Sequence, residues 1–271
     1  MKIAAGLALL LGFAAVATAN CNDSNVRVLE EQQGDVIRLL GQSDGLLDYT
    51  ITLRISLDNM EASGPLPATV VVKDHQTAEL IVLRVKDAQR PHGYHLDPRW
   101  RYGAPGGAPD HAAYLLPYLP GEKHQLTQGY FGKFSHSAGT QNEYAYDWSM
   151  PVGTTVCAAR EGVVVGVRQD SDTGGPSPAY GNCGNYVVIR HHDGTYAEYL
   201  HLQKDGVLVA LGAAVEAGQP IGLSGATGFV SVPHLHFAVF RTLDGLRRET
   251  LPVAIKTRAG LGQRLTEGQV Y

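Results

Sequence analysis

The chain contains 271 residues, of which 44% are hydrophobic and 18% are charged. This balance is typical of a folded protein with one or two domains and excludes an intrinsically disordered chain. The formal net charge is −4, so no excess of basic residues points to nucleic acid or to an anionic membrane as a partner.

Residues 1–19 have the pattern of a secretory signal. Lys2 precedes an apolar run over residues 3–16, and three small residues follow it. We expect cleavage after residue 19 and an exported protein, periplasmic or extracellular, with a net charge of about −5 once Lys2 is lost. The apolar run is shorter than the roughly 20 residues that a transmembrane helix needs, and no later stretch approaches that length, so we expect no transmembrane segment.

The three cysteines have different expected states. Cys21 follows the predicted signal and could carry a lipid, but Asn20 argues against this alternative, because lipoprotein signals usually have a small residue there. In an oxidising compartment Cys157 and Cys183, 26 positions apart, could form a disulfide that stabilises the fold by about 3 to 4 kcal/mol in the chain-entropy model. With this pairing, Cys21 would not take part in an intramolecular disulfide.

Residues 49–57 alternate between apolar and polar side chains over nine positions, which predicts a half-buried strand. Residues 68–73 and 79–85 are two further β-rich runs, separated by polar or turn-forming residues. No helical period of 3.6 residues occurs among these runs. We therefore expect residues 20–90 to form a small β-sandwich-like domain.

A change of composition follows this domain. Residues 91–120 are rich in Pro, Gly, Tyr and His, which predicts a linker or a covering loop and a domain boundary. Residues 121–252 return to strands and tight turns, and residues 253–271 are expected to form a C-terminal tail. Strands of the second domain are predicted at 155–159, 162–168, 185–191 and 195–200. The predicted fold class is therefore all-β.

Pro233-His234-Leu235-His236-Phe237 is the most informative motif of the chain. Residues two apart on a β-strand point to the same face, so both imidazoles can enter one site. The apolar and aromatic neighbours favour a strand at this place. Such a histidine pair suggests a metal, although ordinary strand histidines have the same spacing, so further ligands are needed.

Four blocks of the sequence resemble, in the same order, the lysostaphin-type (LytM-type) zinc metallopeptidases, which cut the peptide part of bacterial cell walls. These blocks are residues 129–154, 158–164, 199–202 and 233–237. The resemblance covers residues 121–252 and implies an antiparallel β catalytic domain there.

The resemblance also implies the site residues. It implies that His136, Asp147 and His236 bind one zinc ion per chain, and that His201 and His234 are catalytic. Many members of the family have three residues between the zinc histidine and the aspartate, whereas ten separate His136 from Asp147. We interpret the longer segment as a subgroup insertion.

The chemistry of these residues fits such a site. Two histidines and a carboxylate, with a fourth position open to water, are a standard ligand set for catalytic zinc. We favour His234 as the general base, because it shares a strand face with His236, and His201 as the group that stabilises the oxyanion. The two roles could also be exchanged.

The sequence thus predicts a zinc endopeptidase that hydrolyses peptide bonds in peptidoglycan cross-links or stem peptides. A secreted protease of glycine-rich proteins is an alternative within the enzymes. A non-catalytic wall-binding or amidase-activating module is disfavoured, because all five polar positions are retained. A structural zinc site is disfavoured by its having only three protein ligands.

Overall fold

Strand β3 (Tyr49–Asp58) lies where the alternating residues predict it. The computed structural model describes residues 26–261 and 264–271, and the predicted signal segment and Cys21 lie outside them. Ile51 and Leu53 of β3 are fully buried, as the alternation requires. Thr50 and Thr52 are buried as well, so the first half of this strand is buried on both faces rather than on one.

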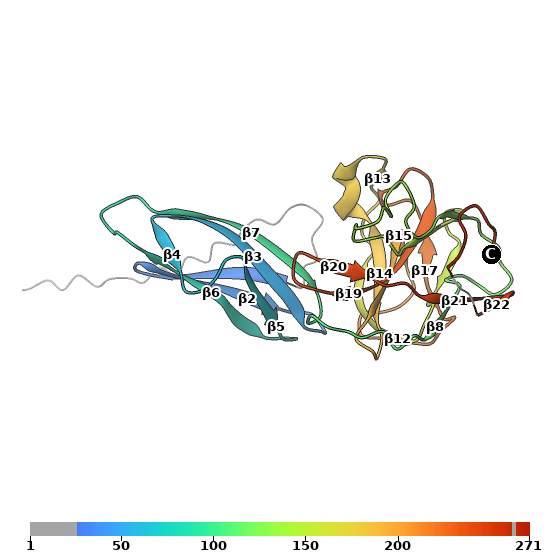
Figure 1. The fold of residues 1–271 in the computed structure, drawn as a ribbon, viewed down its shortest axis with the longest axis horizontal. Helices are drawn as coiled ribbons and strands as arrows, with labels where there is room; N and C mark the ends of the chain where they lie inside the picture. Colours follow the sequence, from blue (N-terminus) through green and yellow to red (C-terminus); the bar gives the residue numbers. More distant parts are fainter. Residues whose placement is uncertain (1–25, 262–263) are drawn as a thin grey trace, which may run out of the picture. The chain divides into compact units, whose positions relative to one another are not determined.

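Residues 26–102 form a sandwich of two sheets, with strand orders β1-β2-β6-β4 and β5-β3-β7 (Figure 1). Every strand pair in it is antiparallel. Besides β3, its strands are β1 (Val26–Gln33), β2 (Val36–Ser43), β4 (Met60–Ala62), β5 (Ala68–Val72), β6 (Thr77–Val85) and β7 (Gly93–Tyr102). This arrangement confirms the predicted β-sandwich-like domain.

The last strand of this unit falls in the stretch that the sequence analysis assigns to a linker. β7 pairs with β3 over its whole length, from Gly93 opposite Asp58 to Tyr102 opposite Tyr49. A second compact unit begins at Gly103, at the start of the Pro- and Gly-rich segment. The boundary between the units therefore lies at 102/103.

The second unit is built on one ten-stranded sheet, in which β16-β12-β14-β15-β19-β10-β9 are neighbours in this order. Strands β11, β17 and β20 complete this sheet, and two smaller sheets, β22-β21-β8 and β13-β18, accompany it. The strands of the second unit are β8 (Ala113–Leu115), β9 (Leu126–Gln128), β10 (Tyr146–Ser149), β11 (Thr155–Cys157), β12 (Gly162–Arg168), β13 (Gly174–Gly175), β14 (Asn185–Arg190), β15 (Tyr196–Val207), β16 (Ala214–Val215), β17 (Pro220–Ser224), β18 (Gly228–Phe229), β19 (His234–Thr242), β20 (Arg248–Thr250), β21 (Ala254–Thr257) and β22 (Gly260–Leu261).

The 3-10 helix η1 (Pro178–Cys183) is the single helix among the described residues. None of the helical structure in 26–261 and 264–271 is long and apolar enough to cross a membrane. The predicted all-β class is confirmed.

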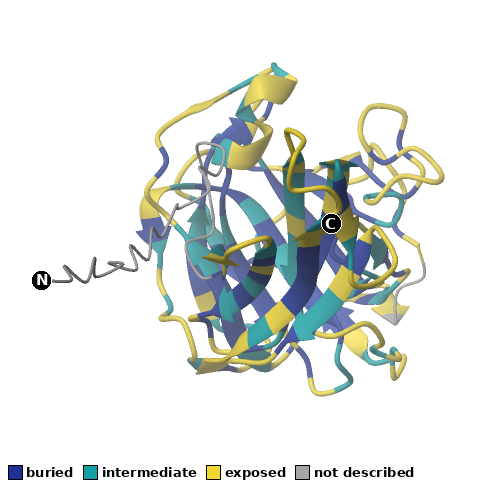
Figure 2. Cartoon of the chain, turned by 90° about the vertical axis from the view of Figure 1, so that its left-hand side faces the viewer, coloured by how far each residue is buried: buried dark blue, intermediate teal, exposed yellow. Residues whose placement is uncertain are grey.

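Aromatic side chains fill the core of the second unit. Trp148, Tyr199 and Phe237 are almost completely buried, and the ring of Phe237 lies 6.2 Å from that of Trp148 and 5.2 Å from that of Tyr199. Figure 2 shows the buried residues along the strands and most exposed residues along the connections. These large rings fix the faces of the strands that carry the polar site described below.

The C-terminal residues belong to this unit. Strand β21 pairs in parallel with β8, and Ile255 on it is fully buried. The backbone N–H of His124 donates to the carbonyl of Tyr271 at 3.0 Å. The second unit therefore spans 103–271, whereas the sequence analysis delimits its domain at 121–252.

The expected disulfide between Cys157 and Cys183 is wrong. Cys157, on β11, keeps a free and fully buried thiol. Cys183 ends η1 and is disulfide-bonded, and the third cysteine, Cys21, lies outside the described residues. Separation in sequence gave no information on which way the thiol of Cys157 faces in its strand.

Gly41 allows the two sheets of the first unit to approach each other. A Cβ at this position would lie 2.7 Å from Ile51 Cδ1 and 2.9 Å from Val72 Cγ2, both on the opposing sheet. We expect Gly41→Ala to lower the free energy of unfolding by about 1 to 3 kcal/mol, because overpacking forces neighbours from their positions. Urea unfolding measures this change. Gly64→Ala is the matched control, since a Cβ there meets nothing within 4 Å, and an equal loss in both variants would contradict the packing argument.

Candidate metal and catalytic site

The pairing of β10 with β19 determines which residues face the candidate site. In this antiparallel pair Asp147 stands opposite His236, and Ser149 stands opposite His234. Tyr146 and Phe237 form the alternate pair and are buried in the core. Because successive residues of a strand face opposite sides of the sheet, burying the aromatic residues turns the carboxylate and both imidazoles to the other face.

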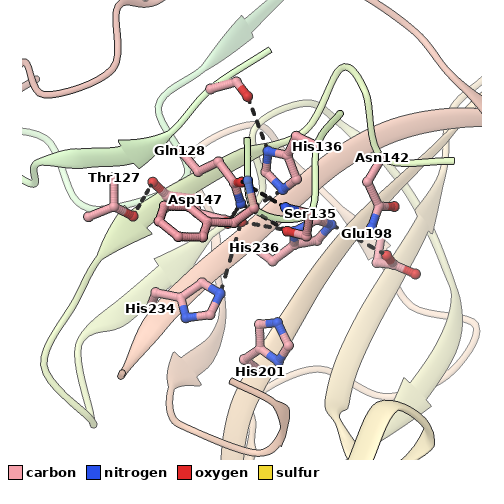
Figure 3. Close-up of polar contacts among 12 residues, drawn as sticks. Thr127, Gln128, Ser135, His136, Asn142, Asp147, Glu198, His201, His234 and His236 are labelled. Carbon is pink, nitrogen blue, oxygen red and sulfur yellow. Dashed lines mark hydrogen bonds and ion pairs between the residues drawn. The ribbon is translucent and has the colours of Figure 1, made fainter. Parts of the chain in front are cut away.

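His136 reaches the same place from the connection between β9 and β10 (Figure 3). Its side chain is completely buried, and its Nδ1 lies 3.2 Å from the carbonyl oxygen of Gly129. One possible ligand atom from each of His136, Asp147 and His236 lies within 4.8 Å of the others. The structure thus brings together the three residues predicted to bind metal.

The contacts of His136 fit a site that binds a cation. A carbonyl oxygen only accepts, so His136 Nδ1 carries a proton, and in the neutral ring Nε2 presents a lone pair. That Nε2 lies 3.4 Å from Asp147 Oδ2 and has no hydrogen-bond partner. A lone pair facing a carboxylate in a buried site is unfavourable unless a cation lies between them. Two imidazoles and a carboxylate are donors that suit zinc.

Asp147 is charged in this environment. Burial by itself would raise the pKa of its carboxyl group, but the neighbouring imidazole groups of His136 and His236 outweigh burial and hold the pKa well below its usual range. His236 Nδ1 lies 2.9 Å from Asp147 Oδ1. Gln128 Nε2 donates to the other oxygen, Oδ2, at 2.7 Å. The carboxylate is therefore oriented from both sides.

His201 and His234 lie beside this cluster, with ring centroids 4.5 Å apart (Figure 3). His201 Nδ1 donates to the carbonyl of Thr227 at 2.7 Å, and His234 Nδ1 donates to that of Val232 at 2.8 Å. In the neutral form of each ring the lone pair therefore lies on Nε2. Burial, followed by the neighbouring His234 and His236, lowers the pKa of His201 to about 3, so this imidazole is neutral. His234 Nε2 lies 4.0 Å from Asp147 Oδ1.

Gln128 is a site residue that the sequence analysis missed. Its Oε1 accepts from the backbone N–H groups of Phe134 and Ser135 at 3.0 and 2.9 Å, while its Nε2 donates to Asp147. One buried amide therefore orients both the segment before His136 and the carboxylate. The available signal was the alternation of β9, which places polar Gln128 on the same face as buried Leu126.

Glu198 and Arg248 were also missed. Arg248, on β20, donates to both carboxylate oxygens of Glu198 at 2.9 and 3.0 Å, and to Asn142 Oδ1 at 2.9 Å. Asn142 belongs to the insertion 137–146, which lies between the first two predicted ligands. Burial alone would raise the pKa of Glu198, but the guanidinium group of Arg248 outweighs burial and lowers it.

Two further histidines of the second unit, His191 and His192, have different surroundings. His191 Nδ1 donates to the carbonyl of Glu161 at 2.8 Å. His192 Nε2 lies 3.0 Å from Asp110, and its Nδ1 lies 3.1 Å from Arg160.

Comparison with known proteins agrees with this geometry. Residues 141–247 match the family described as peptidase family M23. The chain is 45% identical over 91 residues to the peptidoglycan DD-endopeptidase ShyA of Vibrio cholerae, which covers 34% of this chain and 18% of that protein. It is 35% identical over 143 residues to the glycyl-glycine endopeptidase ALE-1 of Staphylococcus capitis, covering 51% of this chain and 36% of that protein.

A solved structure is also similar. The catalytic domain of the antimicrobial peptidase lysostaphin from Staphylococcus simulans is 28% identical, with 48% of this chain and 87% of that chain covered and a TM-score of 0.33. The chain spans less than two thirds of the length of the curated relatives that it matches. Asp147, His201 and the histidine pair of β19 all fall within the matched residues. The resemblance found in the sequence motifs is confirmed, because residues 141–247 of the second unit match peptidase family M23.

Proposed function

We propose that this protein is a zinc-dependent endopeptidase that hydrolyses peptide bonds in peptidoglycan, with one zinc ion held by His136, Asp147 and His236. The observation that carries this proposal is the convergence of the His136 Nε2 lone pair with a charged, buried carboxylate and a second imidazole. The family match supports peptide hydrolysis.

Bound zinc would lower the pKa of a water molecule and polarise the scissile carbonyl. The protein supplies the proton transfers. His201 and His234 each present an Nε2 lone pair, so either can accept a proton from the attacking water. We assign this step to His234, which lies on the same strand as His236 and is more exposed than His201. His201 can stabilise the oxyanion through Nε2 only once it is protonated.

The substrate and the location follow from the same proposal. Relatives named for DD-endopeptidase and glycyl-glycine endopeptidase activities support peptidoglycan as the substrate and differ in the bond that they name. Action on peptidoglycan requires export, for which residues 1–19 have the appropriate pattern. The disulfide-bonded state of Cys183 is consistent with an oxidising compartment.

Two single substitutions separate metal binding from proton transfer. We expect His236→Ala to lose both zinc and activity, because it removes a ligand. His234→Ala should keep about one zinc ion per chain and lower turnover by at least about 10²-fold, because it removes only a proton acceptor. Metal analysis of the purified proteins and initial rates measure the two effects. Equal loss of zinc in both variants would show that the assigned roles are wrong.

Digestion of purified peptidoglycan tests the reaction itself. We expect the mature protein to release soluble peptides, and a chelator followed by added zinc to stop and then restore the release. Mass analysis of the products identifies the bond that is cut. A zinc-loaded protein that releases nothing from peptidoglycan would contradict the proposed substrate, and cleavage that persists in chelator would contradict the role of the metal.

A further inference from the structure

The far nitrogen of His236 has no assigned role in the site described above. Nδ1 of this ring faces Asp147 at 2.9 Å. Nε2, at the opposite side of the ring, is buried and has no hydrogen-bond partner. A neutral imidazole that offers one nitrogen to a metal carries its proton on the other. Zinc at Nδ1 would thus place a buried N–H at Nε2, which requires an acceptor.

Glu198 is positioned to be that acceptor. Its Oε1 lies 4.0 Å from His236 Nε2, and a shift of about 1 Å would bring the pair to hydrogen-bond distance (Figure 3). Strands β15 and β19 are paired, with Leu200 opposite His236 and Glu198 opposite Ala238. Glu198 and His236 are therefore diagonal neighbours, an arrangement that long side chains can bridge.

Arg248 fixes the orientation of this carboxylate. The two side chains are only 15% and 14% exposed, and the guanidinium group binds both oxygens of Glu198. Its Cζ also lies 4.6 Å from the centroid of the Phe240 ring. A buried bidentate pair stacked on an aromatic ring has little freedom to rotate.

The same guanidinium group holds the insertion. Arg248 donates to Asn142 Oδ1 at 2.9 Å, and the backbone N–H of Tyr144 donates to Thr250 Oγ1 on the same strand at 3.2 Å. The insertion 137–146 is thereby attached to β20, whose neighbour β19 carries His236. One buried ion pair contacts both the segment between His136 and Asp147 and the surroundings of the third ligand.

We propose that Glu198 and Arg248 are positioning residues for metal binding: Glu198 accepts the Nε2 proton of His236 and so presents Nδ1 to the metal, while Arg248 orients Glu198 and anchors the insertion. This inference rests on the proposed zinc site and assigns to it two residues outside the ligand set. It also explains how a long insertion can coexist with a closely spaced ligand set.

Zinc affinity of the full mature protein tests the proposal, measured by competition with a chromophoric chelator. We expect Glu198→Leu to weaken zinc binding by about 10- to 100-fold, because the buried N–H loses its acceptor. Glu198→Gln keeps an acceptor oxygen and should recover part of that loss. Folding of each variant is verified by urea unfolding without metal, so that a structural defect is distinguished from a weaker site.

Asp193→Asn is the matched control. Asp193 is 5% exposed on its side chain and accepts from the buried Arg160 at 2.9 Å, and neither residue contacts the three ligands. This substitution should lower stability and leave zinc affinity within about twofold of the wild type. A folded Glu198→Leu protein with wild-type affinity, or an Asp193→Asn protein with an equal loss, would overturn the proposal.

Nitrogen NMR of the zinc-loaded wild-type protein provides a test that does not depend on the folding of a variant. The proposal requires a proton on His236 Nε2 and metal on Nδ1, and metal on Nε2 would overturn it. Absence of zinc from the wild type would overturn the proposed function and this inference together. Equal zinc affinity in folded Glu198 variants would overturn this inference alone.

Discussion

The register between β10 and β19 is the constraint on which the rest of the site depends. Asp147 and His236 are 89 positions apart in the sequence and become direct neighbours only because these two strands pair with this register. A shift by one residue would bury the carboxylate in the aromatic core and expose Tyr146, so the core enforces the register that the site needs. The burial of the aromatic side chains and the placement of the ligands therefore both follow from one strand pairing.

Contacts with buried polar groups then orient the residues that the strands bring together. The carboxylate of Asp147 accepts hydrogen bonds from His236 and from the Gln128 amide, which also orders the segment before His136. On the opposite side, the ion pair of Glu198 and Arg248 lies next to His236 and holds the insertion. Because buried polar groups without partners are costly, these contacts restrict the site to few arrangements.

The two histidines outside the ligand set are oriented by main-chain carbonyls. Thr227 and Val232 accept the Nδ1 protons of His201 and His234, so the Nε2 atom of each ring points away from those bonds. His201 also has a φ of 70°, a conformation that residues other than glycine rarely adopt. The hydrogen bond from its Nδ1 to the carbonyl of Thr227, at 2.7 Å, orients the ring. The result is a pair of proton acceptors beside a metal-binding cluster.

The sequence by itself determined the features that depend on local pattern. Alternation in residues 49–57 identified β3, and the motif at 233–237 identified the start of β19 and the common face of its histidines. The family resemblance supplied the ligand set, which the structure brings together. Only the tertiary structure decided the free state of Cys157, the place of 93–102 in a sheet, and the contacts of Gln128 and Glu198. The physical reason is that side-chain periodicity encodes which face of a strand is buried, whereas contacts between distant residues depend on strand register and on the packing of the whole core.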